Sequence, residues 1–129
     1  MVLAEVGGEM VGYTMVVAAP PADADVAGVL RLRPEVELSK VYVEAGSHGV
    51  GVARPLMAET LRVARELAGE RGLDGEAGIW LGVNEHNSRA IRFYERSGFR
   101  IVGTRSFRLS DAVETDHVME QALAATAGE

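Results

Sequence analysis

The chain has 129 residues, a length that predicts one domain, residues 1–129, built around a single hydrophobic core. Its formal charge of −6 disfavours a nucleic-acid partner, which needs clustered Lys and Arg, and suits a cationic small molecule. The absence of cysteine excludes thiol nucleophiles, disulfides and thiolate metal sites. No apolar run approaches the roughly 20 residues that cross a bilayer, and the first residues lack the basic region of a signal peptide. We therefore expect a cytoplasmic protein with no membrane partner.

The first part of the chain predicts a hairpin followed by a central strand. Two β-type segments, Val2 to Glu5 and Met10 to Ala18, are separated by Gly7-Gly8, a dipeptide that adopts positive φ at low cost. Asp23 to Arg33 is expected to be a loop. From Glu37 to Val43 apolar and polar residues alternate only loosely, as in a strand that is covered on both faces.

A glycine-punctuated turn, residues 48–53, joins this strand to a helix that begins near Arg54. The N-terminus of a helix directs unpaired backbone N–H groups and the positive end of the helix dipole at one spot, so a phosphate or diphosphate can bind there. Pro55 falls in the first turn, where a missing donor costs little. The stripe expected to face the core consists of Val52, Leu56, Thr60, Val63 and Leu67.

The second half of the chain predicts one more helix between strands. Ile79 to Val83 is a short buried strand that should lie parallel to the central strand, by the right-handed crossover rule. Asn87 is a good N-cap for a short helix that stops at Gly98. Phe99 to Phe107 and Thr115 to Leu123 are the remaining strands. The predicted fold class is α/β (α+β): a mixed, mainly antiparallel sheet with one parallel strand–helix–strand unit.

Two stretches resemble the GNAT superfamily of acetyl-CoA-dependent N-acetyltransferases. The family's signature turn, (Gln/Arg)-x-x-Gly-x-(Gly/Ala), corresponds here to His48-x-x-Gly51-x-Ala53. The block NEHNSRAIRFYERSGF is similar to the family's Asn-x-x-Ala-x-x-Phe-Tyr-x-x-x-Gly-Phe. The resemblance covers Glu37 to Thr104, more than half of the chain. The resemblance implies a GNAT-like fold and an acyltransferase that uses acetyl-CoA.

A finer resemblance points to one branch of that family. The segments ELSKVYV, WLGVNEHNSRAIRFYERSGF and VGTRSFRLSDAVETDHVME are similar to the PaiA-type branch, which acetylates spermidine and spermine. Two features depart from the family. His48 stands where Gln or Arg is usual, and the chain starts at the hairpin, without the strand and helix pair that normally precede it and wall the acceptor groove. The expected fold is therefore an N-terminally shortened one, in which an upstream segment or a second subunit would close that side.

The resemblance assigns the acetyl-CoA site. In the family the strand before the turn splays from its neighbour, so the backbone near Tyr42 and Val43 would pair with the pantetheine arm. Asn87 would cap its helix and could also bond the pantetheine amides, although capping alone explains it equally well. No metal is expected, since the three histidines lack ligand spacing. The residues that would bind the diphosphate are those of the turn, unless the turn is only structural: His48, Gly49, Val50, Gly51, Val52 and Ala53.

Acetyl transfer to an amine needs a proton donor for the thiolate and a base for the amine. The resemblance assigns the role of acid to Tyr94. A phenol of pKa near 10 is protonated at pH 7, as that role requires. The alternative is that Tyr94 is a core residue. Glu37 is the favoured base over Glu44, although a solvated charge explains either as well. His86 and His117 are further options. Phe93 and Ile91 are expected to be core residues.

The sequence therefore predicts an N-acetyltransferase acting on a primary amine, with a polyamine as the first acceptor considered and attack within a ternary complex. A protein N-terminus or an amino acid is the alternative acceptor. A second class of function is a non-catalytic acyl-CoA-binding or assembly module. A mononucleotide site is disfavoured, because the turn lacks the Gly-Lys-Ser/Thr of phosphate-binding loops. A homodimer is expected, since the outer strand of a shortened sheet exposes an edge.

Overall fold

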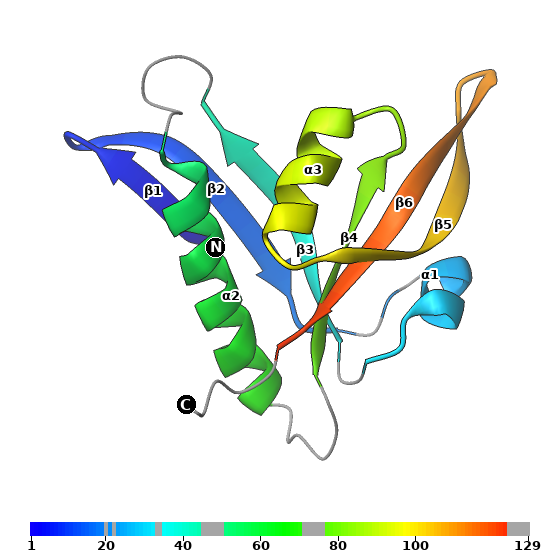
Figure 1. Cartoon of the computed structure of the whole chain (residues 1–129), viewed down its shortest axis with the longest axis horizontal. Coiled ribbons are helices and arrows are strands. Elements are labelled where there is room, and N and C mark those ends of the chain that lie inside the picture. The colour runs from blue at the N-terminus through cyan, green and yellow to red at the C-terminus, as the bar shows by residue number, and fades with distance from the viewer. Residues whose placement is uncertain (20, 22, 33–34, 45–50, 71–76, 124–129) are drawn as a thin grey trace.

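A computed structural model describes residues 1–19, 21, 23–32, 35–44, 51–70 and 77–123. A six-stranded sheet forms the centre of the molecule, in the order β1-β2-β3-β4-β6-β5 (Figure 1). Every neighbouring pair is antiparallel except β3 and β4, which are parallel. The predicted fold class is therefore confirmed. The strands are β1 (Val2–Val6), β2 (Glu9–Val17), β3 (Glu35–Val43), β4 (Gly78–Asn84), β5 (Arg100–Leu109) and β6 (Ala112–Ala122).

The two hairpins have turn residues that suit tight reversals. Gly7 and Gly8 take φ values of 61° and 84° between β1 and β2, as the sequence predicts for a turn with two positive φ angles. Between β5 and β6 the reversal occurs at Ser110, with φ 56°, and Asp111. The β5–β6 strands are longer than predicted and reach almost to this turn.

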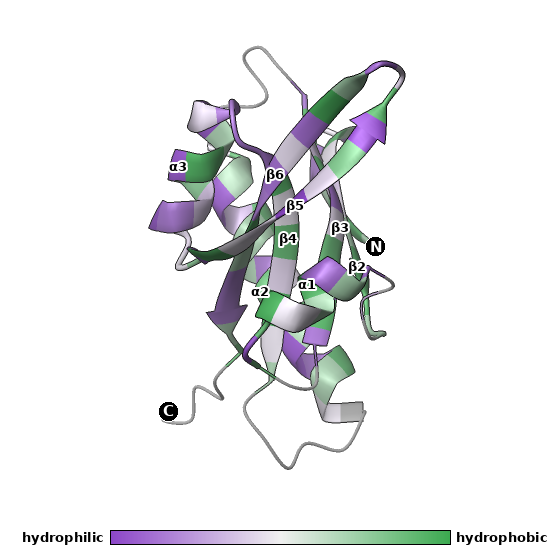
Figure 2. Cartoon of the chain, turned by 90° about the vertical axis from the view of Figure 1, so that its right-hand side faces the viewer, coloured by the Kyte–Doolittle hydropathy of each residue, from purple (hydrophilic) through white to green (hydrophobic). Residues whose placement is uncertain are grey.

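Helices cover both faces of the sheet. α2 (Ala53–Glu70) and α3 (Ser88–Arg96) pack on one face, which we call the α2 face, around a core that includes Leu81 of β4. On the opposite face, the α1 face, α1 (Ala24–Val29) packs against Trp80 and Val118 (Figure 2). None of the helices in the described residues has the length and apolar character that a bilayer crossing requires.

The loop predicted for Asp23 to Arg33 was wrong, because α1 lies within it. Asp23 caps this helix by accepting a hydrogen bond from the Asp25 amide at 2.8 Å, and Val26 is fully buried beneath it. A helix of 6 residues spans less than two turns, too few for a hydrophobic period to show in sequence. Burial against the sheet, rather than an intrinsic pattern, determines it.

The buried stripe of α2 agrees with the prediction in its first half only. Leu56 and Thr60 are buried as expected, but further along Ala64 and Ala68 face the core while Val63 is only half-buried. The alanines present almost no side chain, so the helix can lie close to the sheet at this end. The predicted stripe favoured the bulkier Val63 and thus followed hydrophobicity instead of close packing.

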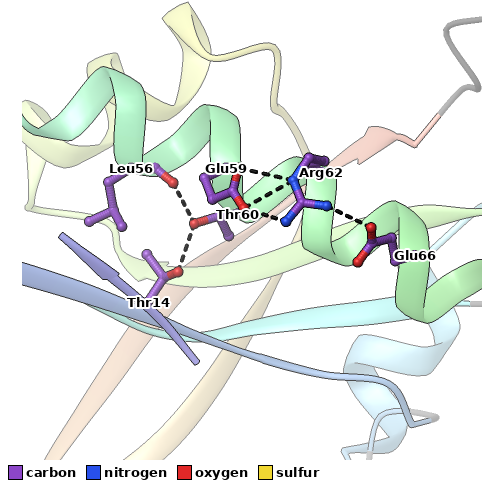
Figure 3. A network of polar contacts seen from close by, with 6 residues as sticks. All are labelled: Thr14, Leu56, Glu59, Thr60, Arg62 and Glu66. Carbon is purple, nitrogen blue, oxygen red and sulfur yellow. Dashed lines mark hydrogen bonds and ion pairs between the residues drawn. The ribbon is translucent and has the colours of Figure 1, made fainter.

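A buried pair of hydroxyl groups ties α2 to the sheet (Figure 3). Thr14 of β2 and Thr60 are hydrogen-bonded through their hydroxyls at 2.7 Å, and Thr60 also donates to the Leu56 carbonyl at 2.6 Å. On the outer side of the same helix Arg62 pairs with Glu59 and Glu66. The first contact is buried and fixes the helix against β2; the second is exposed and belongs to the solvated face.

α3 begins and ends where the sequence predicts. The Asn87 side chain accepts from the Ala90 amide at 3.2 Å, and Gly98, at φ 105°, follows the last turn. Gln121 of β6 donates to the Ser97 carbonyl at 2.9 Å. The C-terminal end of α3 is therefore tied to the sheet, which fixes the side chains that this end presents.

Candidate active site

The parallel strands β3 and β4 pair over a short stretch and then separate. The paired positions are Glu35 with Gly78, Val36 with Ile79, and Glu37 with Trp80. Beyond these, β3 continues to Val43 and β4 to Asn84 with no further pairing between them in the part of the chain that is described. Figure 1 shows their upper ends apart, on the side where α3 lies. Backbone groups of both strands are thus free for another partner in this opening.

The direction of the backbone along β3 decides which residues face the opening. The Glu44 amide donates to the Val11 carbonyl of β2 at 2.7 Å. Because successive residues of a strand direct their N–H and C=O groups to opposite sides, those of Tyr42 also face β2, while those of Val43 face the opening. Of the two residues predicted to pair with a pantetheine arm, alternation favours Val43.

A pocket of about 260 Å³ lies between the start of α2 and the end of α3. Gly51 and Ala53 of the predicted turn belong to it, and Val52 between them is half-buried. His48, Gly49 and Val50 lie outside the described residues. The residues that line the pocket are Gly51, Ala53, Arg54, Phe93, Arg96 and Ser97.

The pocket is positively charged for two independent reasons. Arg54 and Arg96 contribute guanidinium groups from different helices, and the positive end of the α2 dipole points into the same region. The first turn of α2 carries no acidic residue, although acidic side chains are favoured there. A cation at the N-terminus of α2 is unfavourable by itself, because it meets the positive end of the helix dipole. An anion bound in the pocket would make the interaction with both positive charges favourable. The arrangement fits a diphosphate or another polyanion.

Sequence reasoning did not single out either arginine. Arg54 had a signal, because it directly follows the glycine turn in the first helical turn, against the preference of the dipole. Arg96 had none, since its meeting with Arg54 depends on the way that α3 is tied to β6. Phe93 packs against the core as expected and also lines the pocket.

Tyr94 is held on the inner side of α3 by aromatic packing. Its ring meets Phe99 edge-on at 5.9 Å between centroids and lies 5.7 Å from Phe93. The side chain is half-buried against the core cluster that contains Leu81 and Val83 of β4. Burial raises the pKa of the Tyr94 phenol above its ordinary value. The group therefore stays protonated at neutral pH, as a proton donor must.

Asn87 serves as the cap of α3, which confirms that half of its predicted role. Its Oδ1 is occupied by the Ala90 amide, whereas its Nδ2 has no partner among the described residues. The side chain is exposed. A donor to a ligand carbonyl is therefore available at the start of α3.

Glu37 lies on the face of the sheet opposite the pocket. Glu37 is opposite Trp80 in the register, so the two side chains share the α1 face. Glu44 follows the end of β3 and is half-buried. Glu37 thus stands at the point where β3 and β4 begin to separate, on the face opposite α2 and α3.

The two histidines that are further candidate bases, His86 and His117, have different environments. His86 is exposed, with Nε2 3.6 Å from Glu85 Oε2. His117 lies opposite Val83 on the α2 face, and its Nδ1 is buried without a partner in the described part of the chain. Within those same residues no group of three or more His, Cys, Asp or Glu side chains could hold a metal ion.

Comparison with known proteins identifies the family. The sequence model of the acetyltransferase (GNAT) family matches residues 1–99, well over half of the chain. The chain therefore belongs to the acetyltransferase (GNAT) family. An uncharacterized N-acetyltransferase of Mycobacterium tuberculosis is 40% identical over 116 residues, which cover 90% of this chain and 62% of that protein. The chain thus spans less than two thirds of the length of this relative.

Solved structures share the fold. A ribosomal-protein-alanine N-acetyltransferase from Brucella melitensis matches with a TM-score of 0.68 and 24% identity, covering 93% of this chain and 66% of that one. Naa50 of Arabidopsis thaliana, solved with the bisubstrate analogue CoA-Ac-MVNAL, matches with a TM-score of 0.64 and 20% identity, covering 92% and 70%. At these identities the likeness supports the fold alone. The polyamine branch suggested by the sequence finds no support in these comparisons.

Proposed function

We propose that the chain is an acetyl-CoA-dependent N-acetyltransferase that acts on a primary amine. The observation that carries the proposal is the separation of β3 and β4 after Glu37 and Trp80, beside a cationic pocket at the start of α2. The pocket suits the diphosphate of CoA, and the free backbone groups of the opening suit the amides of its pantetheine arm. Membership of the acetyltransferase (GNAT) family and the CoA analogue bound by Naa50 support the same ligand.

We assign each part of CoA to the element of the fold that would bind it. The segment that the sequence predicts as a turn, with His48, Gly49, Val50, Gly51, Val52 and Ala53, would bind the diphosphate together with the two arginines of the pocket. The backbone of Val43, and of Tyr42 less directly, would orient the arm, and Asn87 Nδ2 would donate to one of its amide carbonyls. The thioester would then lie in the opening, with Tyr94 on one side of the sheet and Glu37 on the other.

The chemical step follows from that arrangement. An acceptor ammonium loses a proton to Glu37, directly or through water, and the neutral nitrogen attacks the thioester carbonyl. The C–N bond forms and the C–S bond breaks, the attacking nitrogen releases its second proton to solvent, and the Tyr94 hydroxyl protonates the departing thiolate. Glu37 then passes the proton it accepted to solvent. The phenolate then recovers its proton from solvent. Glu44 is the alternative base if Glu37 proves dispensable.

The acceptor is a primary amine. The sequence resemblance and the net charge of −6 support a polyamine such as spermidine, and a protein N-terminus or an amino acid is the alternative. We further propose a cytoplasmic homodimer, since both outer strands of the described sheet, β1 and β5, have one neighbour only. Light scattering after size-exclusion chromatography tests the dimer.

Release of CoA tests the proposal. The protein is incubated with acetyl-CoA and spermidine, amino acids or short peptides, and free thiol is followed with a thiol reagent. Acceptor-dependent thiol release with at least one class supports the proposal. CoA binding in calorimetry without turnover on any acceptor would instead favour a non-catalytic acyl-CoA-binding module.

A further inference from the structure

On the α1 face, an arginine from the outermost strand reaches across the sheet to the place where β3 and β4 separate. Arg105 of β5 pairs in register with Asp116 of β6, and its guanidinium extends past it to Gly82 of β4. Gly82 lies two residues beyond Trp80, where pairing with β3 ends. If the thioester lies in the opening, an amine that approaches from the α1 face passes this guanidinium.

The guanidinium is fixed from three directions. Nε and Nη2 both donate to Asp116 Oδ2, at 3.1 and 3.0 Å. The Trp80 ring lies beneath it, 5.8 Å from the guanidinium carbon to the ring centroid, and is itself only 3% exposed. At Gly82 a Cβ atom would come within 2.5 Å of Nη2, so only glycine leaves room for the group. Arg105 is therefore held in a site shaped to accept it.

One donor of this fixed group remains available. Nη1 has no hydrogen-bond partner among the described residues, and the Arg105 side chain keeps 26% exposure while that of Asp116 keeps 10%. Glu37, directly opposite Trp80, lies on the same face. A hydrogen-bond donor and a carboxylate thus flank Trp80 at the mouth of the opening.

We propose that Arg105 is an acceptor-recognition residue, whose Nη1 donates to a carbonyl oxygen next to the reacting amine. The acceptor class is then an α-amino compound with a neighbouring carbonyl, as in an amino-acid amide or a peptide N-terminus. Its ammonium faces Glu37 and its carbonyl faces Arg105. This inference rests on the proposed function and narrows the acceptor of the same site.

The chemistry of the pair favours this class over a polyamine. A protonated polyamine offers hydrogen-bond donors only, so Nη1 has nothing to bind in it. Asp116 already neutralises the charge of Arg105. The pair therefore suits a neutral carbonyl oxygen better than a free carboxylate, which an unpaired positive charge would attract. The remaining donor is directional and fixed, which is the property that recognition of one oxygen requires.

The test compares matched acceptors in matched variants. Alaninamide carries the carbonyl, sec-butylamine has a similar branched shape without it, and spermidine represents the polyamines. Arg105→Met removes the donor, and Arg105→Met with Asp116→Asn removes it without leaving a buried charge unpaired. Arg108→Met, on the exposed part of the same strand, is the control. The readout is the ratio of kcat/KM for alaninamide to that for sec-butylamine, in which the fraction of active protein cancels.

We expect Arg105→Met and the double variant to lower this ratio about tenfold or more, the scale of one charge-assisted hydrogen bond, and Arg108→Met to leave it unchanged. An unchanged ratio, or a wild-type preference for spermidine, overturns the inference while the proposed function stands. If no acceptor turns over, alaninamide binding to the CoA-loaded protein is measured in the same variants. Binding that depends on Arg105 then supports the inference although the proposed function fails, and binding that does not depend on it overturns both.

Discussion

Glu37 of β3 and Trp80 of β4 face each other at the last position where the two parallel strands pair. Beyond them the strands separate, so backbone groups with no partner among the described residues border an opening in the middle of a sheet. Such groups need a partner, and an extended ligand with amides of its own can supply it. The pair therefore marks both the end of the parallel ladder and the start of the proposed CoA site.

Replacing Tyr94 with phenylalanine should separate chemistry from binding. The ring and its contact with Phe99 are kept, while the proton donor is lost. We expect kcat to fall about 10²-fold or more and the Kd for CoA to stay the same. Stopped-flow turnover and calorimetry measure the two quantities. An unchanged kcat would remove Tyr94 from the acid role.

The Tyr94 phenol should also lose its proton at a higher pH than an unperturbed tyrosine does. Burial raises its pKa above the usual value near 10, so the folded protein keeps this proton at a pH where the unfolded chain loses it. The free energy of unfolding therefore falls as pH rises above the pKa that Tyr94 has in the unfolded chain. Below that pKa the group makes no pH-dependent contribution to stability. Ultraviolet difference titration of wild type against Tyr94→Phe should show a phenol with a midpoint above 10. A midpoint at or below that value contradicts the burial argument.

The two arginines of the pocket should matter for CoA affinity. Arg54→Met and Arg96→Met each remove a cation from the lining, and we expect each to weaken CoA binding about tenfold. Arg62→Met is the matched control, because Arg62 is on α2 but pairs with Glu59 and Glu66 on its outer side. If the control weakens binding as much as the pocket variants do, the effect is one of overall charge and not of the pocket.

The hydroxyl pair between β2 and α2 should contribute to stability. Thr60→Val leaves the buried Thr14 hydroxyl without its partner and should cost about 1–3 kcal/mol in the free energy of unfolding. Thr14→Val leaves Thr60 bonded to the Leu56 carbonyl and should cost less. Urea unfolding of both single variants and the double variant forms a cycle. Costs that simply add would show that the two hydroxyls do not interact.

Alanine at Gly82 should disturb Arg105 without unfolding the protein. The new Cβ meets the guanidinium end of Arg105, which must shift to make room, and none of the three nearest atoms belongs to the backbone. We expect the melting temperature to change little and the preference for alaninamide over sec-butylamine to fall as in Arg105→Met. Gly69→Ala, where a Cβ meets nothing within 4 Å, is the control. Retention of the preference in Gly82→Ala would show that the position of the guanidinium is unimportant.

The features that could be predicted from sequence are those with local causes. The Gly7-Gly8 turn and the limits of α3 at Asn87 and Gly98 follow from backbone preferences of a few residues. α1 could not be predicted in this way, because a six-residue helix is stabilised by the burial of Val26 rather than by its own pattern. The burial of Ala64 could not be predicted either, because it depends on how closely α2 packs against the sheet.

The residues of the site that lie in a sequence motif could be predicted, whereas those that tertiary contacts bring together could not. The glycine turn and Tyr94 stand in recognisable blocks, whereas Arg54 and Arg96 meet only because two helices do. The Arg105–Asp116 pair had a signal: a hairpin that turns at residues 110–111 places positions 105 and 116 opposite each other. The strands predicted to end at Phe107 and to begin at Thr115 left a loop too long to indicate that register.

A crystal structure of the protein with CoA bound tests the proposed site most directly. We expect the diphosphate at the start of α2, near Arg54 and Arg96, and the pantetheine arm between β3 and β4 beyond Glu37 and Trp80. The sulfur should lie within hydrogen-bond reach of the Tyr94 hydroxyl. CoA bound elsewhere, or a sulfur remote from that hydroxyl, would contradict it.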